Sequence, residues 1–219
     1  MAKEKNKVEV VFILDRSGSM SGLEEDTIGG FNSMVEQQKA EGNEILWSTV
    51  LFDHETEVIH DRAPLDKVEP LDRDKYFVRG STALLDAVGG AIHHIANVHK
   101  YAREEDLPDK TLFVITTDGM ENSSLCYSYD KVKRMIEKEK EQYGWEFIFL
   151  GANIDAEGMA ERMGIDRSRA ARFHNDGAGI ACNYTMVSHV ASDLSFGQIN
   201  ESRLEEVRRD YKSRKKHSR

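Results

Sequence analysis

The chain has 219 residues, of which 39% are hydrophobic and 32% charged, and its formal net charge is −9. These values fit one soluble domain with a sizeable core. The negative charge disfavours a general nucleic-acid binder, because affinity for phosphate comes largely from Lys and Arg. No apolar run approaches the roughly 20 residues that span a bilayer, so we expect no membrane span.

The N-terminal sequence and the cysteines bear on the cellular compartment. The first residues lack the apolar stretch of a secretory signal. The two cysteines, Cys126 and Cys182, lie in different segments. We therefore expect reduced thiols and a cytoplasmic protein.

The first third of the chain predicts strands on either side of a helix. Residues 8–14 are almost continuously apolar, which is typical of a strand buried on both faces. An amphipathic helix is expected at about 22–41. Residues 45–52 predict a second strand, and residues 57–60, which follow a turn, predict its antiparallel edge partner.

The same alternation continues through the middle of the chain. Residues 83–101 carry the clearest helical pattern, because their apolar positions recur every three or four residues. Residues 111–117 predict a buried strand, and a helix is expected within 126–142. Residues 145–151 are again nearly all apolar and predict a parallel strand covered on both faces.

The C-terminal part predicts a short helix at 155–163, a weak last strand at 170–174 and a final amphipathic helix from about 176 to 194. From residue 203 onward there are eight basic and three acidic residues. Such a run is typical of a solvated helix end or a disordered tail. Nucleic acid, a membrane or an acidic partner are its alternative uses.

Alternating strands and helices predict an α/β fold. We expect a doubly wound, mostly parallel six-stranded sheet with one antiparallel edge strand and helices on both faces. The domain is assigned to residues 7–195, with an N-terminal extension at 1–6 and a basic C-terminal helix or tail at 196–219.

Three short segments carry oxygen-bearing side chains next to these elements. Asp15, Ser17 and Ser19 follow the first strand, Thr82 opens the clearest helix, and Asp118 follows the strand at 111–117. In an open α/β sheet, ligands bind beyond the carboxyl ends of the strands. We therefore expect two carboxylates and three hydroxyls around one point. Such a set suits a hard cation, since Mg²⁺ prefers oxygen ligands.

These segments resemble the metal-ion-dependent adhesion site of von Willebrand factor type A domains. The resemblance rests on Asp15–Ser19, Gly80–Thr82 and Thr117–Gly119, and it covers about residues 7–195. All five ligand positions are present. The one departure is Ser81, which stands before Thr82 where such domains often carry Gly.

The resemblance implies a role for each ligand residue. Ser17 and Ser19 would bind the ion directly, and Thr82 directly or through water. Asp15 and Asp118 would act mainly through bridging waters and through hydrogen bonds to the hydroxyls. The expected ion is Mg²⁺, with Mn²⁺ or Ca²⁺ as alternatives.

Neutral hydroxyl ligands leave most of the ion's charge for an outside ligand. A carboxylate from an Asp or Glu of a partner protein is the natural one, because a charge-assisted contact is stronger than a neutral one. We therefore expect a metal-dependent protein-binding module. The residues expected to flank the site and influence partner choice are Arg16, Arg79, Met120 and Glu121, together with Met20 and Asn122.

Two other functions stay open at this point. A metal-dependent hydrolase or phosphoryl-transfer enzyme could use the same site, since Asp15 stands where an aspartyl phosphatase has its nucleophile. Such enzymes carry a general-acid Asp two residues on, where this chain has Ser17. No Gly-rich phosphate loop with Lys and no Gly-x-Ser-x-Gly elbow is present either, so we expect no catalysis. The third possibility is a structural subunit whose site is vestigial.

Overall fold

The structure, a computed structural model, describes residues 6–215. The strands are β1 (Val8–Asp15), β2 (Ile45–Phe52), β3 (Thr56–Pro64), β4 (Lys110–Thr117), β5 (Glu146–Ala152) and β6 (Ala170–Phe173). The helices are α1 (Glu24–Glu41), α2 (Leu84–Tyr101), α3 (Tyr129–Tyr143), α4 (Ala156–Arg162), α5 (Gly177–Ser195) and α6 (Ser202–Lys215). The predicted elements are thus found in the predicted order.

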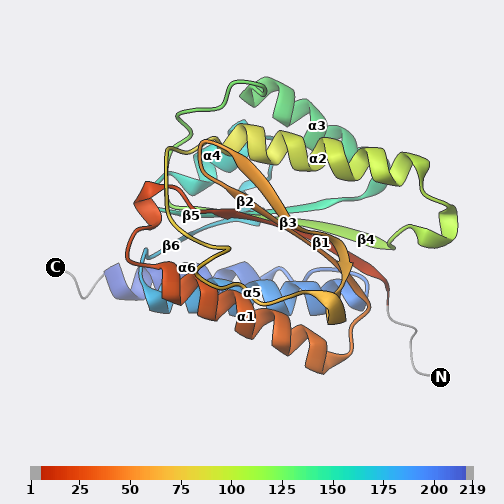
Figure 1. The fold of residues 1–219 in the computed structure, drawn as a ribbon, viewed down its shortest axis with the longest axis horizontal. Helices are drawn as coiled ribbons and strands as arrows, with labels where there is room; N and C mark the ends of the chain where they lie inside the picture. Colours follow the sequence, from red (N-terminus) through yellow and green to blue (C-terminus); the bar gives the residue numbers. More distant parts are fainter. Residues whose placement is uncertain (1–5, 216–219) are drawn as a thin grey trace.

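The strands form one six-stranded sheet in the order β3-β2-β1-β4-β5-β6. The pairing of β2 with β3 is antiparallel, and the other four pairings are parallel. Helices α2, α3 and α4 cover one face of the sheet, and α1, α5 and α6 cover the other (Figure 1). The predicted doubly wound α/β fold with one antiparallel edge is confirmed.

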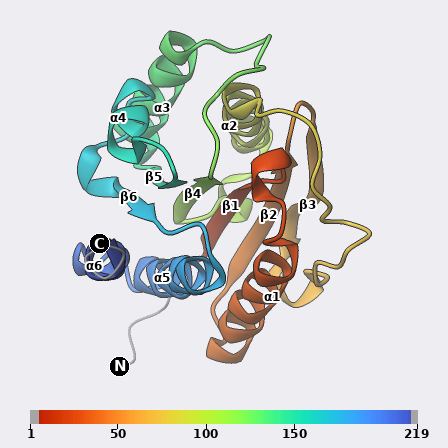
Figure 2. The ribbon, with the colours of Figure 1, turned by 90° about the vertical axis from the view of Figure 1, so that its left-hand side faces the viewer.

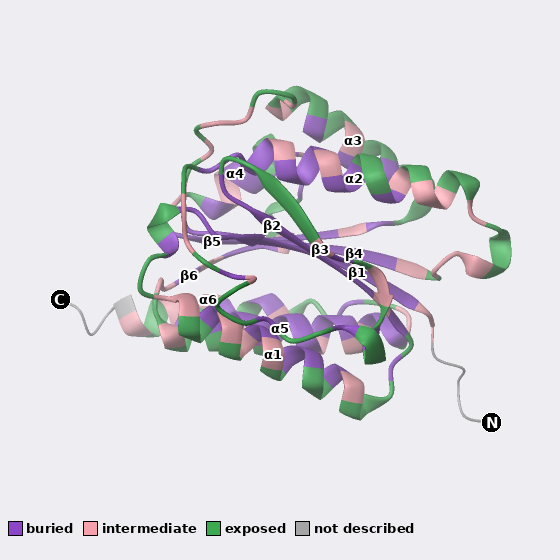
Figure 3. Cartoon of the chain, in the orientation of Figure 1, coloured by how far each residue is buried: buried purple, intermediate pink, exposed green. Residues whose placement is uncertain are grey.

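The central strands belong to two apolar cores, because successive side chains of a strand point to opposite faces of the sheet. Every residue of β1 is buried. Phe12 packs with Phe31 and Trp47 on the side of α1 and α5, whereas Val11 and Ile13 join the core beneath α2 and α3. Figure 3 shows this continuous buried layer between the two helical layers. A rigid, doubly covered sheet is the support on which the loops at its ends rest.

The basic C-terminal segment forms a helix that packs on the domain. Leu204 and Val207 of α6 are buried in the core beside α5 and β6. The guanidinium of Arg208 donates hydrogen bonds to the backbone carbonyls of the segment that leads into β6. The charge pattern favours a solvated helix end or a disordered tail, because the many basic residues around Leu204 and Val207 obscure these two apolar positions. The ends of the predicted extension and tail, residues 1–5 and 216–219, lie outside the described residues.

Among residues 6–215, no helix is both long enough and apolar enough to span a bilayer.

Candidate metal centre

The three predicted segments meet at the carboxyl ends of β1 and β4, the side of the molecule that faces the viewer in Figure 2. The chain leaves β1 toward β2, whereas β4 lies on the other side of β1. This is a point at which the strand order reverses, and in open α/β sheets a crevice forms there. The pairing of Leu14 with Thr116 places the ends of both strands side by side. The segment that precedes α2 is hydrogen-bonded to the loop that follows β1, through Arg79 N–H to Arg16 O and Gly18 N–H to Gly80 O.

The predicted hydroxyl groups are in mutual hydrogen-bond contact. The Oγ atoms of Ser17 and Ser19 are 3.2 Å apart, and the hydroxyl of Thr82 donates to Ser17 Oγ at 3.1 Å. Ser19 donates in turn to the carboxylate of Asp118. Ser17 and Thr82 are buried, while Ser19 is exposed, so the cluster opens to solvent at Ser19. Four of the five predicted ligand residues therefore form one connected group.

The fifth residue, Asp15, holds the first loop in place. Its Oδ1 accepts a hydrogen bond from the backbone N–H of Ser17 at 2.7 Å, and its Oδ2 accepts one from the hydroxyl of Thr117 at 2.5 Å. The phenol of Tyr76 donates to the backbone carbonyl of Asp15 at 2.7 Å. We did not predict roles for Thr117 and Tyr76. Thr117 lies within a segment that carries the resemblance, whereas nothing in the local sequence marks Tyr76.

The two carboxylates of the site, those of Asp15 and Asp118, are buried. Asp15 is fully buried and Asp118 nearly so. Burial raises the pKa of Asp15 to about 6, with a smaller raising effect from Asp118 and against the lowering effect of the hydrogen bonds from Thr117 and Ser17. Burial also raises the pKa of Asp118, against the lowering effect of hydrogen bonds from Ser19 and Asn175. No Lys, Arg or His among residues 6–215 pairs with either group. A divalent ion at the adjoining hydroxyls would supply this missing charge, so the residues present fit such an ion.

Close backbone approaches bring the three loops together. A Cβ atom on Gly119 would lie 2.9 Å from Thr82 Oγ1 and 3.3 Å from Ser19 Oγ, so only glycine leaves room for these hydroxyls. The backbone N–H of Gly18 donates to the carbonyl of Gly80 at 3.1 Å. These two glycine contacts set the distance between the first loop and the other two.

A fourth segment, which the sequence analysis missed, also reaches the site. Asn175 lies between β6 and α5, and its Nδ2 donates to Asp118 Oδ2 at 2.9 Å. It directly precedes Asp176, the N-cap residue of α5. No local motif could have identified it, because its contact with Asp118 spans 57 residues of sequence.

The structure corrects the prediction that Arg16 lies on the rim. Arg16 is fully buried, and its guanidinium pairs with Asp53 and Glu57 at 2.7 Å each. Alternate side chains of an extended segment point in opposite directions. Since Asp15 and Ser17 face the site, Arg16 faces away from it, toward the end of β2. Its role is to support the loop.

The five other residues predicted to flank the site differ in how far they are available. Met20 is buried, which corrects its place on the rim. Asn122 is hydrogen-bonded to Thr82.

Arg79 is partly exposed and pairs with Asp53 and Glu55 at 2.9 and 3.0 Å. Glu121 turns inward, and its carboxylate accepts hydrogen bonds from the first turn of α2 and from its own loop. The prediction that Glu121 lies on the rim is therefore wrong as well. Met120 is 68% exposed. Of these three, Met120 is therefore the residue whose exposed side chain makes no ion pair or hydrogen bond with residues 6–215.

A second group of possible ligand atoms, from Asp53, His54 and Glu55, lies nearby at the start of the β2–β3 turn. The Asp53 carboxylate already receives hydrogen bonds from the guanidinium groups of Arg16 and Arg79. Two cations thus compensate this carboxylate, in contrast to Asp15 and Asp118.

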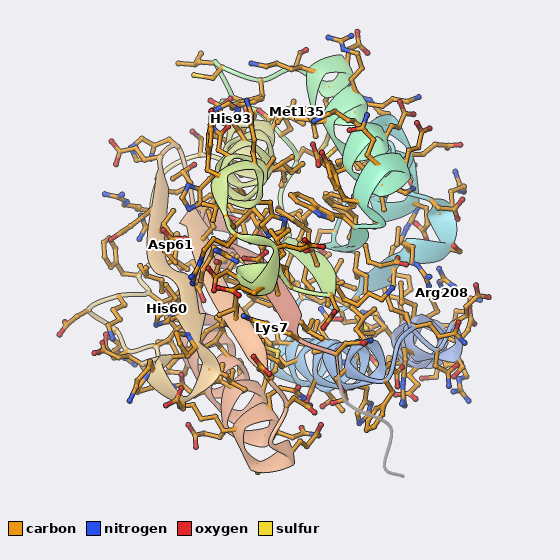
Figure 4. All side chains as sticks on the ribbon, turned by 90° about the vertical axis from the view of Figure 1, so that its right-hand side faces the viewer. Lys7, His60, Asp61, His93, Met135 and Arg208 are labelled. Carbon is orange, nitrogen blue, oxygen red and sulfur yellow. The ribbon has the colours of Figure 1, made fainter. Side chains whose placement is uncertain are left out.

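Two clefts in the described part of the chain are lined by none of the predicted ligand residues. One of about 650 Å³ separates α2 from α3, and its lining includes His93, Met135 and Trp145. Figure 4, drawn from the side opposite to Figure 2, shows His93 and Met135 on the two walls of this cleft. A cavity of about 20 Å³, lined in part by Met20 and Tyr184, lies beneath the loops that carry the predicted ligand residues, which we call the metal loops after the predicted ion.

The raised pKa of Asp15 predicts how stability depends on pH when no metal is present. The folded protein holds this proton up to about pH 6, whereas an unfolded chain releases it near 3.8. The folded state therefore binds more protons in this window, and its stability rises as the pH falls from 7 toward 4. The gain is at most about 3 kcal/mol, because each pKa unit corresponds to about 1.4 kcal/mol.

Urea unfolding in the presence of a chelator checks this expectation. The difference between wild type and Asp15→Asn isolates Asp15 together with its electrostatic coupling to Asp118, since residues farther from the site titrate alike in both proteins. A pH dependence that is identical in the two proteins would contradict it.

Comparison with known proteins identifies the fold. No family model matches the sequence, and no curated protein matches it. Solved structures do. The von Willebrand factor type A protein of Catenulispora acidiphila has a TM-score of 0.57 at 14% identity, and the match covers 85% of this chain and 43% of that one. The vWF domain of the pilus tip protein Mfa5 of Porphyromonas gingivalis has a TM-score of 0.62 at 11% identity, covering 90% and 97%.

The PilB minor pilin of Streptococcus sanguinis is a further match, with a TM-score of 0.62 and 13% identity over 90% of this chain and 64% of that one. The chain spans about half to two thirds of the length of several matching chains. At these identities the likeness establishes the fold alone, which is that of a von Willebrand factor type A domain.

Proposed function

We propose that this chain, which has the von Willebrand factor type A fold, is a non-enzymatic module that binds a partner protein through a divalent metal ion. Ser17, Ser19 and Thr82 would hold the ion, with Asp15 and Asp118 behind them. The observation that carries the proposal is the pair of buried carboxylates, which have no basic side-chain partner among residues 6–215, beside a cluster of three hydroxyls. When bound, Mg²⁺ would supply an open coordination position for an acidic side chain of the partner.

The arrangement supports docking over catalysis. Asp15, the counterpart of a phosphatase nucleophile, has both carboxylate oxygens engaged, one by Ser17 N and one by the hydroxyl of Thr117. Ser19, by contrast, is exposed at the surface, where a side chain from another protein can reach it. Chains with the same fold include a pilus adhesin of Lactobacillus rhamnosus, whose name indicates an adhesive role for that protein.

Partner capture with and without a chelator tests the proposal. Immobilised wild type in Mg²⁺ is expected to retain proteins that EDTA releases. The double variant Ser17→Ala/Ser19→Ala should retain none of them, because it removes two ligand hydroxyls. Ser33→Ala, an exposed hydroxyl on α1, is the matched control and should behave as wild type. The same captured set for wild type, for the double variant and in EDTA would contradict the proposal.

A further inference from the structure

Large apolar side chains are exposed on both sides of the metal loops. Met120 and Leu125, in the loop that follows β4, are 68% and 93% exposed, and Phe77, in the segment that precedes Gly80, is 43% exposed. Single exposed apolar residues are normal on a protein surface. These three, however, lie in the two segments that also carry Asp118 and Thr82.

The first half of the β4–α3 loop is fixed by Glu121. Its carboxylate accepts the backbone N–H groups of Ser123 and Ser124, at 3.0 and 2.8 Å, and that of Leu85 in α2 at 2.9 Å. Asn122 adds two bonds to Thr82, since its side chain accepts from Thr82 N at 2.9 Å and its own N–H donates to Thr82 O at 3.1 Å. The loop is thereby joined directly to a predicted ligand residue.

The second half of the loop is fixed by Asp86 in the first turn of α2. Its carboxylate accepts the consecutive backbone N–H groups of Leu125, Cys126 and Tyr127 at 2.8 to 2.9 Å. The backbone that presents Leu125 is therefore held rigidly, although the side chain itself stands in water. A preorganised apolar contact residue loses little conformational entropy when a partner covers it.

Phe77 is held on the other side of the site. The guanidinium groups of Arg16 and Arg79 lie 5.3 and 5.5 Å from the centre of its ring. Both arginines pair with Asp53 at the end of β2, so Phe77 lies on the β2 side of β1. Met120 follows β4 on the opposite side of β1. The hydroxyl cluster therefore lies between two fixed apolar positions.

The charged groups of the rim are already engaged with one another or with backbone. Arg16 and Arg79 pair with Asp53, Glu55 and Glu57, while Glu121 and Asp86 accept backbone hydrogen bonds. Within the described residues, the charged groups next to Met120, Leu125 and Phe77 therefore leave little free charge to select a partner there. The exposed surface beside the metal loops is instead best matched by apolar groups.

We propose that the docking segment of the partner carries an acidic residue with large apolar side chains close to it in sequence. These side chains pack against Met120 and Leu125 on one side of the site and against Phe77 on the other. The inference rests on the proposed function, since the acidic residue is the one that completes the metal site. It adds that the apolar neighbours decide which acidic segments bind.

A displayed library of random peptides with a fixed central aspartate tests this inference on the full chain. Selection in Mg²⁺ is expected to enrich peptides that have Leu, Ile, Met or an aromatic residue within a few positions of the aspartate. EDTA should abolish this enrichment. The affinity of one enriched peptide is then measured by fluorescence polarisation for each variant of the protein.

Leu125→Ser and Met120→Ser are each expected to lower the affinity for the peptide about tenfold, because each loses one large apolar contact that the peptide would bury. The affinity for Mg²⁺ alone should not change, because neither residue is a ligand. Tyr143→Ser, at the far end of α3 and 65% exposed, is the control and should leave peptide affinity unchanged.

The two proposals fail in different ways. Peptides that need both the aspartate and Mg²⁺, but have random neighbours and bind Leu125→Ser as tightly as wild type, would overturn this inference and leave the docking function standing. If no peptide is enriched in an Mg²⁺-dependent manner, the proposed function fails and the inference fails with it.

Discussion

Replacing Asp118 with alanine is expected to weaken Mg²⁺ binding about 10- to 100-fold or more, the range found when a residue that orients metal ligands is removed. Asp118 is buried, accepts a hydrogen bond from the hydroxyl of Ser19 and has no cationic partner among residues 6–215. Its negative charge therefore orients the hydroxyl and favours a cation at the same time. Isothermal titration with Mg²⁺ or Mn²⁺ measures the loss.

Asp118→Asn separates the charge of this residue from its shape. Asparagine keeps the size and one acceptor oxygen but has no charge, so it should also bind Mg²⁺ poorly. Without metal it should be at least as stable as wild type, because burying an unpaired carboxylate is unfavourable. An Asp118→Ala protein that binds Mg²⁺ as tightly as wild type would remove Asp118 from the proposed site.

Arg16→Ala is expected to lower the free energy of unfolding by about 3 kcal/mol or more, since breaking a buried ion pair typically costs 3–5 kcal/mol. The whole side chain of Arg16 is buried, and its guanidinium contacts Asp53, which has no exposed surface either. Removal of Arg16 leaves Asp53 buried with its second guanidinium partner, Arg79, beside the imidazole of His54 at 2.8 Å. That second cation places the loss at the lower end of the range.

Urea unfolding of the metal-free protein measures this loss, with Glu57→Gln as the control. The side chain of Glu57 is 53% exposed, so its pair with Arg16 is partly solvated and should contribute less than about 1 kcal/mol. If Arg16→Ala and Glu57→Gln were equally mild, Arg16 would not be the support for the first loop that its burial indicates.

Local patterns in the sequence were sufficient for the fold and for the main cluster. The apolar runs at 8–14 and 111–117 could only be buried strands, and parallel strands bring their carboxyl ends to one edge of a sheet. Asp15 and Asp118 stand at those ends, so their approach follows from strand pairing. Metal binding at this cluster stays a prediction, which the titrations above would test.

Contacts between distant segments could not be predicted in the same way. Asn175 reaches Asp118 only because β6 lies two strands from β4 and α5 begins beside the site. The sequence predicts Glu121 as a surface residue. Its carboxylate instead accepts a hydrogen bond from the backbone N–H of Leu85, one of the N–H groups in the first turn of α2 that have no partner within the helix. In both cases the partner was set by the packing of whole elements, which carries no local sequence signal.

The sequence by itself determined which side chains can offer oxygen ligands and that they lie at the ends of buried strands, because hydrophobic periodicity and strand polarity are local properties. Only the tertiary structure decided which neighbours face outward. Arg16 is withdrawn into an ion pair at the end of β2, while Met120 and Leu125 remain in water on a loop held by Asp86 and Glu121. The physical reason is that a buried charge must find its partner across the fold, and the position of that partner is known only when the layers have packed.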